Sequence, residues 1–216
     1  MTALTTSDGA AIRKGRKYDQ VLEGARRIFL RDGFEGASVD EIAREAGVSK
    51  ATLYSYFPDK RLLFLEMARL ECLRQADEPL DMTERTAPPR VVLTRAARRI
   101  IEFFTSEFGR QVFRICVAES DRFPALGCQF YESGPKLARE RIALYLRQAA
   151  ARGELRIEDF ELAADQFAEL CKVDLFPRMI CGVAPAFREP EIERVIHGAV
   201  EMFLARYGVA DKAGSS

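Results

Sequence analysis

The residues of this chain whose types and spacing suit a chemical task lie between positions 49 and 60. A helix starting at Lys50 would turn Leu53 and Phe57 inward. Its opposite face would then carry small, hydroxylated, aromatic and cationic side chains: Lys50, Ala51, Thr52, Tyr54, Ser55 and Tyr56. Hydroxyl and ammonium groups donate hydrogen bonds to phosphate oxygens, and Lys also bonds base edges. This set of residues therefore suits a groove of double-stranded DNA and its phosphates.

Two short helices joined by a tight turn are predicted to position these side chains. Ser38 and Glu41 have the spacing of a capping box, in which each side chain satisfies a backbone N–H at the start of a helix. Gly47 follows the last apolar residue of that helix, where the chain often adopts the left-handed conformation that Gly tolerates best. Ser49 can cap the second helix. The pattern over residues 38–60 is typical of a helix-turn-helix, which indicates DNA binding.

The segment GVSKATLYSYFPDK resembles the recognition-helix signature of the TetR family of bacterial transcriptional regulators. The resemblance extends over the preceding amphipathic helix and the segment GFEGASVDEIA, and reaches the start of a long helix after Asp59. It implies an all-α fold, with an N-terminal three-helix DNA-binding head and a C-terminal helical bundle for ligand binding and dimerisation. The rest of the chain resembles the family only in general architecture, so the resemblance does not identify the ligand.

The resemblance also assigns roles to individual positions. The predicted DNA-binding residues are Ser38, Ser49, Lys50, Ala51, Thr52, Tyr54, Ser55, Tyr56 and Lys60. Thr52, Tyr54, Tyr56 and Lys60 match family positions that mostly contact phosphates, and Lys50 and Ala51 match positions that face base edges. Ser38, at a helix N-terminus, suits a phosphate anchor. Asp40 is an anion where a cation would help, and we expect no phosphate contact from it.

The rest of the chain is predicted to be helical, with about nine helices in all. Helices are expected over 59–77, 90–106, 108–120, 125–152 with an interruption at Gly134-Pro135, 159–180 and 191–207. Residues 78–89 lack a periodic apolar face and are predicted to form a loop. The expected organisation is a flexible basic arm (1–14), a helix-turn-helix domain (15–60), an effector-binding and dimerisation domain (61–208) and a disordered tail (209–216).

The basic arm precedes the first helix, and its cations are Arg13, Lys14, Arg16 and Lys17. Such an arm can follow the DNA backbone or enter a minor groove, which adds salt-dependent affinity. A solvated tail is the alternative interpretation. The whole chain has 33 basic and 33 acidic residues, so its net charge does not indicate nucleic acid.

The last two predicted helices carry broad apolar stripes that one subunit has difficulty covering. In the TetR family the C-terminal helices of two subunits form a four-helix interface, and a two-fold dimer matches a palindromic operator. We therefore expect a homodimer through these helices. The alternative is that both stripes pack only against their own domain.

Aromatic side chains gather in the C-terminal domain, where the resemblance implies a cavity for a small-molecule effector. They are Phe103, Phe104, Phe108, Phe113, Phe123, Phe130, Tyr131, Phe167 and Phe176. Plain core packing is the more frequent role for each of them. We expect an apolar or aromatic effector and assign no pocket residues.

The composition excludes several other classes of protein. The single histidine, His197, lies in an apolar stripe and is interpreted as structural, which removes a His-based catalytic triad or a histidine-rich metal centre. No Gly-rich phosphate-binding loop occurs, and we expect no cofactor, no metal and no enzyme activity. No apolar run approaches the roughly 20 residues of a membrane span, so a cytoplasmic protein is expected. The five scattered cysteines are interpreted as reduced core residues.

The sequence therefore predicts a ligand-responsive regulator, most simply a repressor that leaves a pseudo-palindromic operator when its effector binds. Two alternatives remain open at this point. One is an activator on the same fold, and the other is a helical interaction module that has lost DNA binding. Tyr54, Tyr56 and Lys60 favour DNA over the interaction module.

Overall fold

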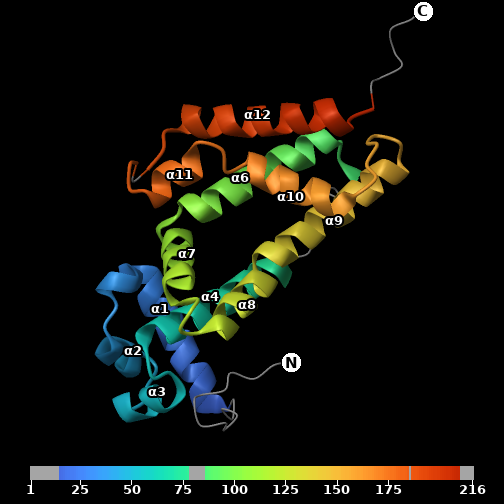
Figure 1. The fold of residues 1–216 in the computed structure, drawn as a ribbon. Coiled ribbons are helices and arrows are strands. Elements are labelled where there is room, and N and C mark those ends of the chain that lie inside the picture. Colours follow the sequence, from blue (N-terminus) through green and yellow to red (C-terminus); the bar gives the residue numbers. More distant parts are fainter. Residues whose placement is uncertain (1–14, 78–85, 185, 210–216) are drawn as a thin grey trace, which may run out of the picture. The chain divides into compact units, whose positions relative to one another are not determined.

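The computed structural model describes residues 15–77, 86–184 and 186–209, and these residues form helices joined by turns and short loops (Figure 1). The predicted arm (1–14) lies outside this range, and so does the predicted tail apart from residue 209. The same holds for most of the predicted loop. Arg16 and Lys17, two of the cations assigned to the arm, are described and belong to the first helix. A lone antiparallel bridge joins Leu155 and Gly208, so the described part of the chain contains no β-sheet. The all-α prediction is confirmed.

The chain divides into two compact units. One unit comprises residues 1–75 and 110–134, and the other comprises 76–109 and 135–216. The predicted boundary near residue 60, between a DNA-binding domain and an effector-binding domain, stays a prediction. In the structure, residues 61–75 and 110–134 belong to the same compact unit as the helix-turn-helix.

The first unit, called the head from here on, contains the predicted helix-turn-helix. Its helices are α1 (Arg16–Gly36), α2 (Val39–Glu45), α3 (Lys50–Tyr56), most of α4 (Lys60–Asp77), most of α7 (Glu107–Glu119) and α8 (Pro124–Ser133). Both predicted N-caps are present, since Ser38 Oγ accepts from the N–H of Glu41 and Ser49 Oγ accepts from the N–H of Thr52, each at 3.1 Å. The other half of the predicted capping box differs, because the Glu41 carboxylate accepts from the Ser38 hydroxyl at 2.9 Å instead of from a backbone N–H. Gly47 has the expected positive φ of 64° in the turn.

Helices α1 and α2 approach each other closely because Gly24 has no side chain. A Cβ atom on Gly24 would lie 2.8 Å from both the Cβ and the backbone N of Ala46. Around this point the head buries Val21, Ala25 and Ile42, none of which is exposed at all. The orientation of α2 relative to α1 therefore depends on a glycine at position 24.

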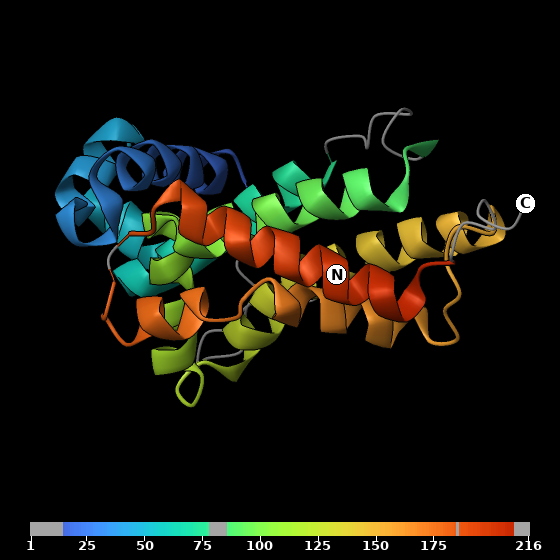
Figure 2. The same ribbon diagram turned by 90° about the horizontal axis from the view of Figure 1, so that it is seen from above.

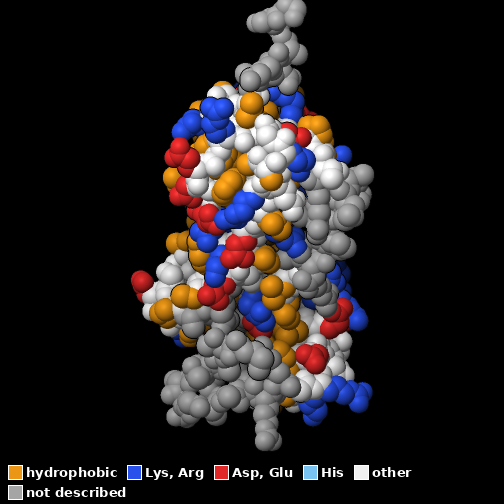
Figure 3. Space-filling model, turned by 90° about the vertical axis from the view of Figure 1, so that its right-hand side faces the viewer, with side chains coloured by type: hydrophobic (Ala, Val, Ile, Leu, Met, Phe, Trp, Pro, Cys, Tyr) orange, Lys and Arg blue, Asp and Glu red, His pale blue; other side chains and the backbone are white. Residues whose placement is uncertain are grey.

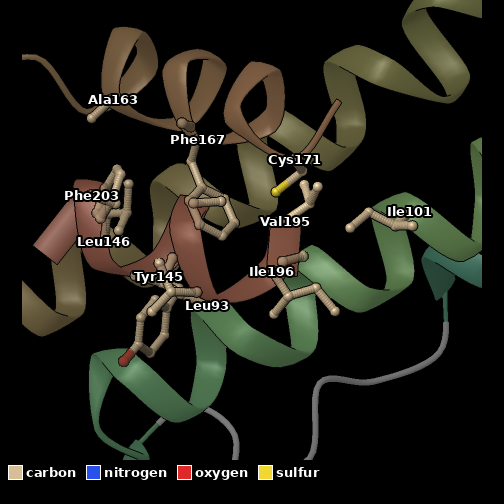
Figure 4. Packing of buried hydrophobic residues seen from close by; sticks show 14 of the residues in the cluster. Leu93, Ile101, Tyr145, Leu146, Ala163, Phe167, Cys171, Val195, Ile196 and Phe203 are labelled. Carbon is tan, nitrogen blue, oxygen red and sulfur yellow. The ribbon is translucent and has the colours of Figure 1, made fainter. Parts of the chain in front are cut away.

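The second unit consists of α6 (Pro89–Thr105), α9 (Pro135–Ala151), α10 (Phe160–Leu170), α11 (Leu175–Ile180) and α12 (Glu189–Tyr207). Helix α12 lies beside α6 and α10 in both ribbon views, and these pairs make tertiary contacts (Figures 1 and 2). Their apolar stripes meet in one core, where Phe167 lies against Phe203 with the ring centroids 5.3 Å apart (Figure 4).

The described residues form eleven helices rather than about nine, because two predicted helices are broken. The break at Gly134-Pro135 was predicted. The break within 159–180 was not, and there the prediction of one continuous helix is wrong. The chain turns over residues 171–174, with Asp174 at a φ of 64°. Pro177 lies in the first turn of α11, where its missing N–H is tolerated, whereas inside a continuous helix it would clash with the preceding turn.

Several of the aromatic side chains considered for an effector cavity pack against the core instead. Phe104 and Phe167 are buried, and the rings of Phe104 and Phe176 meet edge to face at 5.7 Å. Such a pair is favourable beyond the area that it buries. For these residues the core-packing interpretation describes what the structure shows.

Two expectations about single residues are corrected by the structure. Cys171 is a core residue, and burial raises the pKa of its thiol to about 12, but Cys128 and Cys181 are exposed. His197 is not structural in this chain, since 76% of its side chain is exposed. It points away from the core because its neighbours Ile196 and Val200 take the inward positions of α12.

Charged side chains of both signs are mixed on the face in Figure 3, with hydrophobic side chains exposed between them. Many of the charges are paired, as Arg98 is with Glu189 at 2.8 Å. Among the residues that the structure describes, no helix combines the length and apolar character that crossing a bilayer requires.

Replacing Gly24 by Ala should destabilise the head. The new methyl group would overlap Ala46, and overpacking of this kind costs about 1–3 kcal/mol. This exceeds the roughly 0.5–1 kcal/mol that Ala contributes inside a helix. The free energy of unfolding, measured in urea by circular dichroism, checks the expectation. Gly127→Ala in α8 is the matched control, because nothing lies within 4 Å of its Cβ position. Equal stability of both variants would contradict the close approach.

Candidate nucleic-acid interface

The third helix is held in the head by two buried side chains. Leu53 is fully buried and Phe57, at the end of α3, is 2% exposed. The turn before α3 is closed by backbone bonds from Gly47 N to Arg44 O at 3.1 Å and from Val48 N to Ala43 O at 3.0 Å. Because buried side chains fix the inner face of α3 and backbone hydrogen bonds fix the turn before it, the opposite face of α3 forms a well-defined surface.

The outer face of α3 carries the predicted DNA-binding side chains. Ser49, Lys50, Ala51, Tyr54 and Ser55 are exposed, while Thr52 and Tyr56 are half-buried. The structure thus places these seven predicted residues on one helix and its cap. No DNA is present in the structure, so their contacts with it stay predictions.

The hydroxyl groups at the start of α3 bond to one another. Ser49 Oγ and Thr52 Oγ1 lie 2.8 Å apart, and Ser55 Oγ donates to the Thr52 carbonyl oxygen at 2.7 Å. A hydroxyl can donate one bond and accept others, so these groups can exchange partners when a phosphate approaches.

Lys50 and Asp40 form an ion pair that joins the first turns of α2 and α3. Lys50 Nζ lies 2.8 Å from Asp40 Oδ1. The bond to this carboxylate raises the pKa of Lys50, so the ammonium stays protonated. The pair also shows that the N-terminal end of α2, capped by Ser38, lies close to that of α3. From the sequence, Asp40 was expected only to make no phosphate contact, and its ion pair with Lys50 was not predicted.

Lys60 is placed differently from the other predicted contacts. Its Nζ donates to the carbonyl oxygens of Phe34 at 2.8 Å and Ala37 at 3.1 Å, and it lies 4.4 Å from the centre of the Phe34 ring. These bonds tie the start of α4 to the end of α1. An ammonium has three donors, so one N–H remains for a phosphate.

A buried carboxylate connects α4 to α1 behind the recognition helix. Glu66 is 2% exposed, and it accepts a bond from the Tyr18 hydroxyl at 2.7 Å and two from Arg69 at 2.8 and 2.9 Å. Burial, with the bond to Glu66 second, raises the pKa of Tyr18, so the phenol stays protonated and donates. The Tyr18 ring stacks on Phe57 at 5.4 Å and meets Tyr56 edge to face at 5.7 Å.

A second polar cluster joins α4 to α7 within the head. Arg61 bonds both Asp59 and Glu119, and Glu119 is 8% exposed. The guanidinium of Arg61 lowers the pKa of Asp59, so this carboxylate remains charged under all ordinary conditions. Both clusters orient α4 relative to the helices around it.

Sequence reasoning missed the roles of Tyr18, Glu66 and Asp40. Glu66 carried a signal, because it lies in the apolar run LLFLEMARL, where an acidic residue on a buried face needs partners. Tyr18 carried none, since it reads as one more apolar position of an amphipathic helix. The partner of Asp40 depends on the angle between two helices, which the sequence pattern does not specify.

Comparisons with protein families match both parts of the chain. A model described as bacterial regulatory proteins of the tetR family matches residues 21–67. A second model, described as the C-terminal domain of AefR-like transcriptional repressors, matches residues 91–209.

Solved structures resemble the chain over most of its length. The flavonoid-responsive regulator FrrA is 36% identical, with 91% of this chain and 100% of that chain covered and a TM-score of 0.66. A TetR-family regulator from Mesorhizobium loti MAFF303099 is 28% identical at the same coverage, with a TM-score of 0.69.

Curated relatives match a smaller part of the chain. The transcriptional repressor AcnR of Corynebacterium diphtheriae is 41% identical over 61 residues, which are 28% of this chain and 32% of AcnR. The regulator EthR of Mycolicibacterium smegmatis is 35% identical over 89 residues, 41% of this chain and 40% of EthR. The chain therefore spans only about a third of the length of these relatives.

Tyr18→Phe should lower the stability of the head, because Glu66 loses a hydrogen bond that water cannot replace. Leaving a buried acceptor short of a donor costs about 1–3 kcal/mol. Tyr131→Phe is the control, since Tyr131 is 50% exposed in the same unit and its change should stay within about 0.5 kcal/mol. Urea unfolding measures both. Equal midpoints for the two variants would rule out a structural role for the Tyr18–Glu66 bond.

Lys60→Met should affect both stability and DNA binding. Met keeps an apolar stem beside Phe34 but cannot donate to the two carbonyl oxygens, which costs about 1 kcal/mol. If the third N–H bonds a phosphate, the slope of log affinity against log salt concentration falls by about one. Arg44→Met, an exposed cation of the same head, should leave the unfolding midpoint unchanged. An unchanged midpoint for Lys60→Met would contradict the bonds to α1.

Proposed function

Since the chain belongs to the TetR family of bacterial regulatory proteins, we propose that it is a transcriptional repressor that binds a pseudo-palindromic operator as a homodimer. We further propose that a small apolar or aromatic effector releases it from DNA. The curated relatives include the repressor AcnR, matched over 28% of this chain, which supports the repressor role. Family membership also argues against an enzyme.

The exposed face of α3 is the observation that carries the proposal. A helix that is anchored by Leu53 and Phe57 and presents Lys50, Ala51 and Tyr54 outward has the form of a recognition helix. In this proposal Lys50 and Ala51 meet base edges, and Ser38, Ser49, Thr52, Tyr54, Ser55, Tyr56 and Lys60 position the head on phosphates.

The dimer is proposed to form through α10 and α12. Apolar side chains are exposed on both helices, with Leu162 51% and Met202 63% exposed. A second copy of the chain would cover them, and the two-fold axis between the copies would place two recognition helices on successive half-sites of one duplex.

An aromatic effector is supported by the similarity to FrrA, which is named as flavonoid-responsive. The identity of 36% extends over 91% of this chain, and therefore includes the second unit. Planar aromatic compounds suit an apolar helical domain with several Phe residues, because rings pack edge to face or offset against one another. Flavonoids are thus the first compounds to test.

An activator is the second candidate, and one relative favours it. FasR of Mycolicibacterium smegmatis, named as a transcriptional activator, is 39% identical over 57 residues. Transcription in vitro distinguishes the two candidates, because it falls when a repressor is added and rises when an activator is added.

Footprinting tests the proposal most directly. Purified protein is titrated against the DNA that flanks its own gene and against random-sequence DNA, at several salt concentrations. We expect a protected symmetric site, transcription in vitro that falls when the protein is added, and recovery of transcription with a flavonoid. Transcription that rises on addition of the protein would establish an activator. No enrichment of any site would refute the proposal and support an interaction module that does not bind DNA.

Lys50→Ala provides the matched variant for the same assay. If Lys50 meets a base edge, its loss should reduce discrimination between the operator and single-base variants by about 1–3 kcal/mol. Loss of affinity to the same degree for all sequences would show instead that Lys50 contacts only phosphates.

A further inference from the structure

The ion pair between Asp40 and Lys50 places a carboxylate on the surface proposed to face DNA. Asp40 lies in the first turn of α2, and 72% of its side chain is exposed; Lys50 is the first residue of α3, and 52% of its side chain is exposed. Both side chains extend from helix starts into solvent and meet there at 2.8 Å.

A carboxylate at this position needs an explanation, because it repels phosphates. The N-terminus of α2 already has a side-chain cap, since Ser38 accepts from the N–H of Glu41 and donates to the Glu41 carboxylate at 2.9 Å. Favourable interaction of Asp40 with the helix dipole is weak at an exposed site, because solvent and salt screen it. On a surface that binds DNA, a partner among the bases would offset the repulsion.

The pair offers a donor and an acceptor about one hydrogen-bond length apart, and the major-groove edge of a G·C pair offers their complement. Guanine presents two acceptors, O6 and N7, and cytosine presents the N4 donor. O6 and N4 are themselves bonded in the base pair, so they lie about 2.9 Å apart. The 2.8 Å between Lys50 Nζ and Asp40 Oδ1 matches that spacing.

An A·T pair suits the ion pair less well. It presents one acceptor beside its donor, adenine N7 beside N6, and then a second acceptor, thymine O4. The ammonium would bond a single atom there, and the carboxylate would lie next to O4, which repels it. The charges and their spacing therefore favour G·C.

We propose that Asp40 and Lys50 act as a unit that reads one G·C pair in each half-site, with Lys50 donating to guanine O6 and N7 and Asp40 accepting from cytosine N4. The inference rests on the proposed function, and makes Asp40 a specificity-determining residue. On DNA of other sequence Lys50 would have to leave Asp40 to reach a phosphate, and the carboxylate would repel the backbone. Asp40 therefore also weakens non-specific binding.

Selection from random double-stranded DNA, followed by sequencing, tests the inference with the full-length protein. Wild type should enrich a half-site with one G·C pair that Lys50→Ala no longer selects. Asp40→Ala should enrich the same half-site with the preference for G·C over A·T at that position reduced about 5-fold or more, since a good base contact discriminates by about 1–3 kcal/mol. Its affinity for non-specific DNA should rise.

Two further variants separate base reading from overall charge. Asp40→Asn keeps an oxygen acceptor at the same place without the charge, and should retain part of the preference while binding non-specific DNA more tightly. Glu23→Gln removes one charge from α1, where Glu23 lies 3.4 Å from Arg27, and should leave the G·C preference unchanged. Since Asp40 is exposed, both of its variants should unfold at the wild-type temperature.

The outcomes distinguish the two levels of the proposal. If wild type enriches a half-site and Asp40→Ala shows the same preference at every position, the inference is wrong and the repressor proposal stands. If Glu23→Gln loses the G·C preference as strongly as Asp40→Ala, the preference depends on the net charge of the head and not on Asp40. That result would also overturn the inference. If wild type enriches no sequence, the proposed function fails, and the base reading fails with it.

Discussion

The arrangement of helices in the head depends on the buried carboxylate of Glu66. A charge at 2% exposure is costly unless it is paired and hydrogen-bonded, so Tyr18 and Arg69 must both stay in contact with it. Tyr18 in turn packs on Phe57 at the end of α3. The position of α4 is thereby connected to that of the recognition helix through one tyrosine, which holds both helices at fixed distances from α1.

The charges of the head are largely used within the protein. Arg26 pairs with Glu71, Arg27 with Glu45 and Lys50 with Asp40, each at 2.8 Å. Exposed pairs such as Arg27–Glu45 and Lys50–Asp40 add little to stability, so a phosphate or a base can replace the carboxylate in them at small cost. In the proposed function, a chain without net charge binds DNA by exchanging partners, and the inference about Asp40 gives the carboxylates left behind an influence on which sequences are bound.

The second unit uses its aromatic residues mainly for packing. Phe104, Phe167 and Phe203 fill the space between helices, and Cys171 lies among them with its thiol protonated. Packing at this density means that an aromatic effector would displace or reorient side chains on entering. Such a rearrangement is a physical means by which binding of a ligand can alter the unit, in accordance with the proposed release from DNA.

The sequence alone determined what depends on neighbouring residues. The caps at Ser38 and Ser49 and the turn at Gly47 are local features, so the helix-turn-helix and its outward residues could be predicted. The sequence prediction missed the break near Asp174, although Pro177 is a residue that disfavours the interior of a helix. Tertiary structure alone decided what depends on the angles between helices: the burial of Glu66 against Tyr18, the use of Lys60 by carbonyl oxygens of α1, and the pairing of Asp40 with Lys50. These contacts join residues that are distant in sequence or lie on different helices, and no local pattern specifies the distance between them.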